Sequence, residues 1–391
     1  MSGADVVIVG GGPVGLATAI AARLHGLSAL VLERGHEPVE KACGEGILPA
    51  GRAALARLGV DLPTGRPFRG IRYRSDGTVA EADFPDGLTG RGVRRVDLHR
   101  ALAGRARDVG AELRFGTVVA SVGEEEHGVA AETAAGESLR GRFLVGADGL
   151  HSQVRRALGL EAKERAAAHE LRYGVTRHFS GAPVLERVEV VFGDRAEAYL
   201  TPLGDAHGSE GSDAAEEIGV AILWSGGKGG FDTLVAERFP PSFAARLAGL
   251  ARLGRDRGAG PFRQRVRARV RGRAALVGDA GGYVDALTGE GMSLGFEQAE
   301  ALAAAMAAGG LAPYGRAARA LASTPERLTR WALRFAARPA LRRRYVAALE
   351  RDPALFTAFL GALGARRPLP AGRALALLAR LALPPSRAAA S

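Results

Sequence analysis

The chain has 391 residues, more than one hydrophobic core usually holds, so we expect two lobes that share an interface. Hydrophobic residues make up 47% and charged residues 24% of the chain, which excludes a disordered protein. The net charge of +11 comes from arginines spread from Arg23 to Arg387, with 342–344 as the one basic tract. We therefore expect no nucleic-acid partner, because that would require basic residues gathered on one face.

The cysteine count and the apolar runs indicate the cellular compartment of the protein. The single cysteine, Cys43, excludes an intrachain disulfide and a cysteine-based zinc site, and we expect no metal. The apolar run 6–22 lacks a basic leader, and glycines interrupt it after Val9, so it does not read as a signal peptide. No stretch reaches the roughly 20 apolar residues of a membrane-spanning helix. We expect a cytoplasmic protein that at most contacts a membrane surface peripherally.

The first motif lies at the N-terminus. A buried strand over 5–9, a glycine turn, a helix over 14–24 and a second strand over 28–33 form a βαβ unit. The turn contains G-x-G-x-x-G at Gly10, Gly12 and Gly15, a spacing that lets backbone approach a pyrophosphate. Glu33 ends the second strand, where its carboxylate can bind ribose hydroxyls. The unit therefore predicts a dinucleotide site.

The other expected elements alternate between strands and helices. Residues 68–84 predict a hairpin with its turn at Asp76-Gly77, and the Gly/Asp-rich segment 204–217 predicts a surface loop. We expect the chain to be wholly helical from Gly309 to Pro384. The remaining expected elements are a helix over 97–109, a helix from about 293, and strands over 111–122, 128–133, 139–147, 188–192, 219–224 and 274–277.

Three further motifs follow the βαβ unit along the chain. Residues 143–149 include Asp148, residues 276–280 include Gly278 and Asp279, and Arg95 precedes the helix over 97–109. Asp279 ends a buried strand and can present a carboxylate to a ribityl hydroxyl. The glycines of 289–295 begin a helix whose positive end can stabilise a reduced flavin ring.

With these motifs in this order, residues 4–310 resemble the flavoprotein superfamily that includes p-hydroxybenzoate hydroxylase, geranylgeranyl reductases and flavin-dependent halogenases. The resemblance implies an α/β (α+β overall) protein. Its Rossmann-like FAD-binding domain of the glutathione-reductase type would span 1–65, 90–160 and 262–312. An inserted antiparallel-sheet substrate domain would span 66–89 and 161–261, and a helical region 313–391.

The resemblance also implies the cofactors and their contacts. FAD would be the resident cofactor, and NADH or NADPH would donate electrons transiently, because no second full G-x-G-x-x-G is present. We expect Cys43 and Tyr199 as candidate catalytic residues. The predicted FAD-contacting residues are Gly10, Gly12, Pro13, Gly15, Glu33, Arg34, Lys41, Cys43, Gly44, Arg95, Asp148, Gly278, Asp279, Gly289, Gly291 and Met292.

The reaction stays open between several alternatives. Residues 41–46 are similar to a Cys-Gly motif of the geranylgeranyl-reductase branch, whereas 198–203 lack the tryptophan of prenyl reductases. We favour a monooxygenase that hydroxylates a phenolic, polyketide or lipid-like natural product with O2 through a flavin C4a-hydroperoxide. The alternative is a prenyl or geranylgeranyl-type reductase that saturates C=C bonds. A halogenase and a non-catalytic prenyl-protein binder are weaker alternatives.

The substrate side and the C-terminus give three more hypotheses. Tyr73, Tyr199 and His178 lie on expected strands and are candidates to orient a phenol. The C-terminal helices either pack on the flavin domain or cap an apolar substrate tunnel. Residues 374–383, with their flanking arginines, could lie on a membrane surface. We expect a monomer or a homodimer; the sequence does not determine the substrate or the choice of NADH or NADPH.

Overall fold

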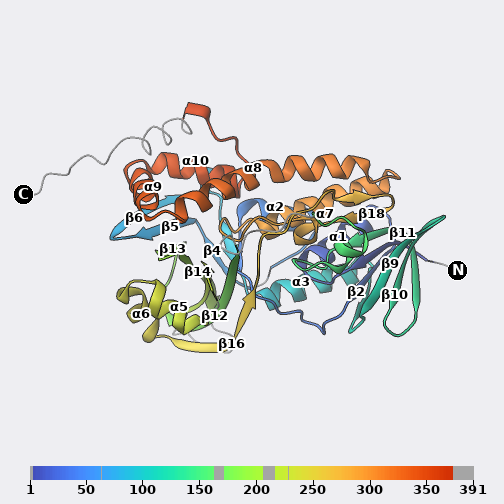
Figure 1. Cartoon of the computed structure of the whole chain (residues 1–391), viewed down its shortest axis with the longest axis horizontal. Coiled ribbons are helices and arrows are strands. Elements are labelled where there is room, and N and C mark those ends of the chain that lie inside the picture. Colours follow the sequence, from blue (N-terminus) through green and yellow to red (C-terminus); the bar gives the residue numbers. More distant parts are fainter. Residues whose placement is uncertain (1–2, 63, 163–170, 206–215, 228, 373–391) are drawn as a thin grey trace, which may run out of the picture.

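A parallel β-sheet forms the base of the larger lobe in the computed structural model, which describes residues 3–372 apart from 63, 163–170, 206–215 and 228 (Figure 1). The sheet confirms the predicted βαβ unit, because its first two strands pair in parallel. An antiparallel edge strand, β17 (Val270–Arg271), completes the row. The five parallel strands, in spatial order, are β18 (Ala274–Leu276), β11 (Ser138–Gly146), β1 (Ala4–Val9), β2 (Ala29–Glu33) and β8 (Glu112–Phe115).

Both faces of this sheet are covered, which is why its strands are continuously apolar. One face packs against α1 (Pro13–Leu24), α3 (Arg95–Asp108) and α7 (Gly291–Ala307) in a shared hydrophobic core. The other face packs against the hairpin of β9 (Val119–Glu125) and β10 (Gly128–Thr133). The α/β class expected from the sequence is confirmed.

A second sheet of seven mainly antiparallel strands forms the other lobe. The expected hairpin is confirmed, with Asp76 and Gly77 at φ angles of 49° and 83°, as a tight two-residue turn requires. The strands in spatial order are β16 (Ala251–Ala259), β12 (Arg172–Ala182), β15 (Glu216–Ser225), β14 (Ala196–Asp205), β13 (Arg187–Gly193), β5 (Gly70–Ser75) and β6 (Thr78–Asp83).

Small elements and the C-terminal helices join the two lobes. A three-stranded sheet and α2 (Pro49–Arg57) follow the first βαβ unit, and α4 (Gln153–Ala157) follows β11. The small sheet consists of β3 (Gly46–Ile47), β7 (Gly90–Gly92) and β4 (Arg66–Phe68). The helices α9 (Pro339–Arg351) and α10 (Pro353–Gly364) pack over the second sheet in a separate core. Helix α8 (Ala312–Ala336) joins both cores, because Tyr314 and Ala318 pack in the first core and Ala336 packs in the second.

The structure corrects two expected elements. The single strand over 111–122 is wrong: Gly116 has a φ of 74° and separates β8 from β9. The C-terminus is not wholly helical, because residues 365–370 form no helix and Arg366 has a φ of 55°. Most of the loop predicted over 204–217, and the segment 374–383, lie outside the described residues. Within the described residues, no helix is long and apolar enough to cross a membrane.

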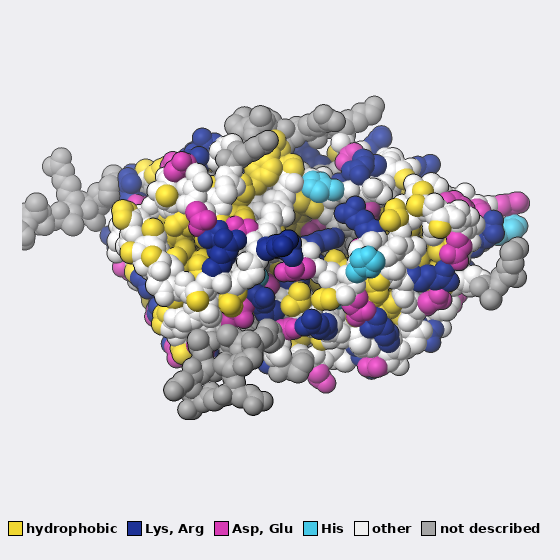
Figure 2. Space-filling model, turned by 90° about the horizontal axis from the view of Figure 1, so that it is seen from below, with side chains coloured by type: hydrophobic (Ala, Val, Ile, Leu, Met, Phe, Trp, Pro, Cys, Tyr) yellow, Lys and Arg dark blue, Asp and Glu magenta, His cyan; other side chains and the backbone are white. Residues whose placement is uncertain are grey.

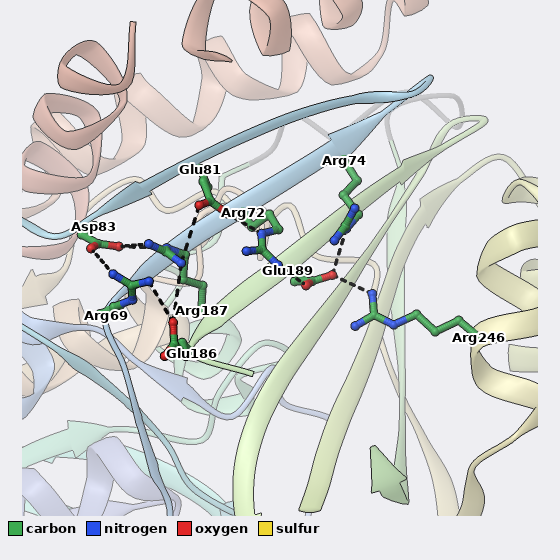
Figure 3. A network of polar contacts seen from close by, with 9 residues as sticks. All are labelled: Arg69, Arg72, Arg74, Glu81, Asp83, Glu186, Arg187, Glu189 and Arg246. Atoms are coloured by element: carbon green, nitrogen blue, oxygen red, sulfur yellow. Dashed lines mark hydrogen bonds and ion pairs between the residues drawn. The ribbon is translucent and has the colours of Figure 1, made fainter. Parts of the chain in front are cut away.

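An ion-pair network occupies the face of the seven-stranded sheet that points away from α10 (Figure 3). Because side chains alternate along a strand, Val188 and Val190 of β13 face the C-terminal helices, whereas Glu189 points the opposite way. Glu189 is 2% exposed, and the guanidinium groups of Arg72, Arg74 and Arg246 contact it at 3.0, 3.1 and 2.6 Å.

The contact with Arg246 has a structural consequence. Arg246 belongs to α6 (Pro241–Ala248), which with α5 (Phe231–Arg238) covers this face of the sheet through an apolar cluster. Burial raises the pKa of Glu189, but hydrogen bonds from Arg246 and Arg74 outweigh burial, and its pKa lies below the ordinary value of 4.5. The ionised carboxylate therefore fastens α6 to β13 and β5.

We expect Glu189→Gln to lower the free energy of unfolding by about 1–3 kcal/mol, because three arginines lose their buried anion. The matched control Glu186→Gln, at a side chain 66% exposed, should cost below about 0.5 kcal/mol. Urea denaturation measures both. Since the folded pKa of Glu189 is depressed, its contribution is full above pH 4.5 and fades as the pH falls through the folded value. A parent–variant gap that grows on acidification would contradict this assignment.

Candidate functional site

One cavity of about 990 Å³ is lined by residues of both large sheets, α7 and α10. Its volume is at the upper end for small-molecule sites and suits a large ligand. On the face shown in Figure 2, apolar side chains lie between basic ones across the middle of the molecule. Most of the predicted FAD-contacting residues line this cavity: Gly10, Gly12, Pro13, Glu33, Arg34, Lys41, Cys43, Gly44, Arg95, Asp148, Asp279, Gly289, Gly291 and Met292.

The glycine turn between β1 and α1 is closely packed at two positions and open at the third. A Cβ atom on Gly10 would lie 2.4 Å from the carbonyl oxygen of Ala147, and Gly10 has a φ of 110°. A Cβ on Gly15 would lie 1.9 Å from the Gly10 carbonyl oxygen. A Cβ on Gly12 would have a guanidinium nitrogen of Arg95 as its nearest neighbour, at 3.8 Å. Gly10 and Gly15 therefore bring helix and strand together, and Gly12 leaves room for a ligand.

Glu33 lies directly beside this turn. Its carboxylate oxygens accept the backbone N–H groups of Gly11 at 2.7 Å and Gly35 at 2.8 Å, and the side chain is 5% exposed. A carboxylate has about four acceptor positions, so these two bonds leave capacity for a ribose hydroxyl. The carboxylate is thus held in one orientation at the end of β2.

The Arg95 side chain offers a positive charge to the turn. Its backbone N–H donates to Glu45 at 2.8 Å, but its buried Nε has no partner among the described residues. A buried guanidinium nitrogen without an acceptor is costly, and a phosphate would supply one. The N-terminus of α1 has no side-chain cap at Gly12. The turn, Arg95 and this helix end fit the diphosphate of FAD.

A second helix N-terminus also lines the cavity. α7 begins at Gly291 without a side-chain cap, and Gly291 and Met292 line the cavity. Asp279 lies close by, and burial raises the pKa of its carboxyl group. A carboxylate here gains stability from hydroxyl donors such as a ribityl chain. Gly278, with a φ of 60°, directs the chain into this position and lines a small neighbouring pocket.

The aspartate of the segment 143–149 forms hydrogen bonds within the local structure. The Asp148 carboxylate accepts from the Ser152 hydroxyl at 2.5 Å and from the backbone of Gln153 at 2.6 Å, so it caps α4. The buried Arg155 donates to the Ala280 carbonyl at 3.2 Å. Arg155 therefore links the segment after 143–149 to the segment 276–280, a role that the sequence analysis did not predict.

Cys43 lines the cavity beside α7. Its sulfur lies 4.0 Å from the Met292 sulfur and accepts the backbone N–H of Glu45 at 3.3 Å. Burial raises the pKa of the Cys43 thiol above its ordinary value of 9.0. At neutral pH the group is a protonated thiol, which is a poor nucleophile. Lys41 lines the same stretch, and burial lowers the pKa of its ammonium group.

Tyr199 lines the cavity, but its hydroxyl is engaged. The hydroxyl donates to the Leu287 carbonyl at 2.7 Å, and burial raises the pKa of Tyr199 well above 10. Next to it, the guanidinium of Arg172 bridges Glu197 at 2.5 Å and Asp285 at 2.9 Å. The contacts of Arg172 with Asp285 and of Tyr199 with Leu287 hold the loop before α7 against the seven-stranded sheet. Arg172 and Asp285 were missed because only the fold brings β12 to this loop.

A buried carboxylate–imidazole pair also lies at the cavity. The His178 Nε2 and a Glu45 carboxylate oxygen are 2.7 Å apart, and both side chains are buried. Glu45 has a φ of 58°, an unusual angle for a residue with a side chain. His178, predicted to orient a phenol, is thus occupied by Glu45. The flanking Gly44 and Gly46 were the available signal for this tight loop.

The end of the cavity under α10 is an apolar chamber. None of its lining residues is charged, and the pKa of Tyr73 is raised to about 12 by burial, while its hydroxyl bonds to Tyr345. Phe356 of α10 packs on the Tyr73 ring with centroids 4.8 Å apart. The chamber is lined by Leu48, Phe68, Ile71, Tyr73, Phe84, Val188, Val190, Leu360 and Leu363. It suits the uncharged, apolar part of a ligand.

Comparison with known proteins agrees with this geometry. Residues 3–181 match the family model described as FAD binding domain. This part of the chain is therefore similar to the FAD-binding domain that its motifs resemble. Among solved structures, the anhydrotetracycline hydroxylase OxyS of Streptomyces rimosus superposes with a TM-score of 0.71 at 24% identity, covering 93% of this chain and 76% of that one. At that identity the likeness shows the fold alone.

Two sequence relatives differ in how much they cover. A rifampicin monooxygenase of Streptomyces venezuelae is 35% identical over 170 residues, 40% of this chain and 34% of that protein. The matched part is therefore only about a third of that relative. A menaquinone reductase of Mycolicibacterium smegmatis is 29% identical over 340 residues, 80% of this chain and 79% of that protein.

We expect Arg95→Gln to weaken FAD binding by roughly 10- to 100-fold, because a charge-assisted hydrogen bond to phosphate contributes about 1.5–3 kcal/mol. Flavin fluorescence titration of apoprotein measures the dissociation constant. Arg100→Gln serves as the control, since this side chain lies on the same helix, is 60% exposed and pairs with Asp97. Equal FAD affinity in Arg95→Gln and Arg100→Gln would contradict the phosphate role.

The protonated state of Cys43 gives a separate expectation. Because its pKa is raised and it is the sole cysteine, iodoacetamide should alkylate the native protein at least about tenfold more slowly than unfolded protein at neutral pH. Mass spectrometry of timed samples measures the rate. Cys43→Ala should keep FAD binding. Rapid alkylation of the native protein at pH 7 would show a reactive thiolate and restore Cys43 as a candidate nucleophile.

Proposed function

We propose that the protein is an FAD-dependent monooxygenase that hydroxylates a large, mainly apolar phenolic, polyketide or lipid-like natural product with NAD(P)H and O2. The observation that carries this proposal is the continuity of one cavity, from the glycine turn at Gly12 to the apolar chamber under α10. A ligand in the chamber and a cofactor on the turn would occupy the same continuous cavity.

The chain's contribution would be to hold the cofactor at both ends. The diphosphate would lie between Gly12 and Arg95, the adenosine ribose at Glu33, and the ribityl chain at Asp279. Gly291 and Met292 would present the uncapped N-terminus of α7 to the flavin ring. FAD, when bound, supplies the redox chemistry and the activation of oxygen.

The remaining cavity residues would position the substrate and exclude water. The hydroxyl of Tyr199, the Glu45–His178 pair and the protonated Cys43 are all engaged or neutral, so we assign them positioning roles. Water exclusion by the chamber would suppress unproductive loss of the activated oxygen. NADH or NADPH would donate its hydride transiently at the rim near Arg156, which also lines the cavity.

The second candidate is reduction of a C=C bond in an isoprenoid or lipid chain. Two observations favour it. The menaquinone reductase is similar along four-fifths of this chain, and the loop with Cys43 and Gly44 lies against α7 as a lining of the cavity. In this reaction oxygen would only reoxidise the reduced flavin without forming product. The two candidates therefore differ in their need for O2.

Oxygen dependence tests the proposal. Purified, flavin-loaded protein is given NADH or NADPH with a set of hydrophobic phenols under 18O2, and separately with polyprenyl quinones without oxygen. The monooxygenase should incorporate one 18O atom into each product molecule. It should consume O2 only when the substrate is present, because the substrate accelerates the reduction of the flavin. Saturated product formed without oxygen, with no 18O incorporation in the aerobic reaction, would overturn the monooxygenase in favour of the reductase.

A further inference from the structure

The positive charge of the chain is concentrated in one stretch. Residues 312–349 contain nine arginines and one acidic residue, Glu326, which gives this stretch a net charge of +8 against +11 for the whole chain. The basic tract at 342–344, expected to be the one such tract, is thus part of a longer arginine-rich stretch. Arg342 is buried, but most of the others lie on α8 and in the turn that follows it.

The helix α8 separates these arginines from its packed side. Its 25 residues extend over about 37 Å along the surface (Figure 1). Tyr314, Ala318, Ala322 and Thr329 are buried on the inner side. The outer side carries exposed residues at helical spacing, here called the arginine stripe: Arg316, Arg319, Arg327, Arg330, Trp331 and Arg334.

Most of the charge on this stripe is not neutralised. Arg330 pairs with Glu326 at 2.6 Å, and Arg327 bonds to the Thr324 hydroxyl at 3.3 Å. Arg316, Arg319 and Arg334 have no carboxylate partner within the parts of the chain that the structure describes. The contrast with Figure 3 is clear, because every arginine drawn there contacts a carboxylate. The stripe thus presents a line of free positive charge.

Trp331 gives the stripe an apolar anchor. Its side chain is 36% exposed and lies between Arg330 and Arg334 on the outer side. Tryptophan prefers the boundary between lipid headgroups and acyl chains, because its ring is apolar and its N–H is polar. A basic helix face with an exposed tryptophan is typical of a segment that lies in the plane of a membrane surface.

We propose that the arginine stripe of α8 docks the protein on an anionic lipid membrane. Each arginine near such a surface contributes about 1 kcal/mol of attraction, so several together bind measurably. The other side of α8 packs, through Leu328 and Phe335, into the core that surrounds the apolar chamber. Docking would therefore place the chamber near a source of apolar molecules. The inference rests on the surface itself and not on the reaction proposed above.

Vesicle binding tests this inference with the flavin-loaded full chain. Cosedimentation is measured with phosphatidylcholine vesicles and with vesicles that also contain about 30 mol% phosphatidylglycerol. We expect binding only to the anionic vesicles, lost when salt is raised from about 0.05 M to about 0.5 M. The triple variant Arg319→Gln, Arg327→Gln, Arg334→Gln should bind on the order of 100-fold more weakly.

A charge-matched control keeps the test specific. Arg195→Gln, Arg252→Gln, Arg255→Gln removes the same charge from exposed positions outside α8, on β16 and in the β13–β14 turn. It should bind anionic vesicles like the parent. Equal loss in both triple variants would reduce the effect to net charge and overturn the inference. So would binding of an oligonucleotide without any binding of vesicles.

Tryptophan fluorescence gives an independent readout. The chain has two tryptophans, and Trp224 is only 6% exposed, so a blue shift on adding anionic vesicles would come from Trp331. We expect the shift in the parent and its absence in Trp331→Phe. A shift that persists in Trp331→Phe would show that another part of the chain contacts the lipid.

Discussion

The close approach of α1 to the end of β1 is the contact on which the rest of the site depends. A Cβ on Gly15 would lie 1.9 Å from the Gly10 carbonyl oxygen, so any side chain there would push the helix away. With glycine, the uncapped helix N-terminus, Arg95 and Glu33 surround one open position at Gly12. The space and the unneutralised positive charge are both consequences of that one steric requirement.

The seven-stranded sheet separates charge from apolar surface by simple alternation. On β13, Glu189 enters the ion-pair network on one face, while Val188 and Val190 line the chamber on the other. Glu189 and its three arginine partners therefore lie on the opposite face of the sheet from the uncharged chamber. The network fastens α6 to the outer face, and the C-terminal helices close the inner one. One face can be charged and the other apolar because successive side chains of a strand point to opposite faces of the sheet.

Much of the fold could be predicted because its signals are local. The βαβ unit, the hairpin at Asp76-Gly77 and the parallel strand before Gly278 follow from short apolar runs and glycine turns. The residues missed at the site form contacts across long sequence separations. Arg172 meets Asp285, and Glu45 meets His178, only after two sheets pack together. The division into the predicted discontinuous domains stays a prediction.

The sequence by itself determined the cofactor class, because glycine spacing and terminal acids create a phosphate and ribose site wherever they fold. Tertiary structure alone decided the state of the candidate catalytic groups. Burial raises the pKa of the Cys43 thiol because it penalises the charged form, and the Tyr199 hydroxyl is occupied because the Leu287 carbonyl lies against it. Solvation and partners depend on which distant segments meet, and that information is spread over the whole chain rather than held in any motif.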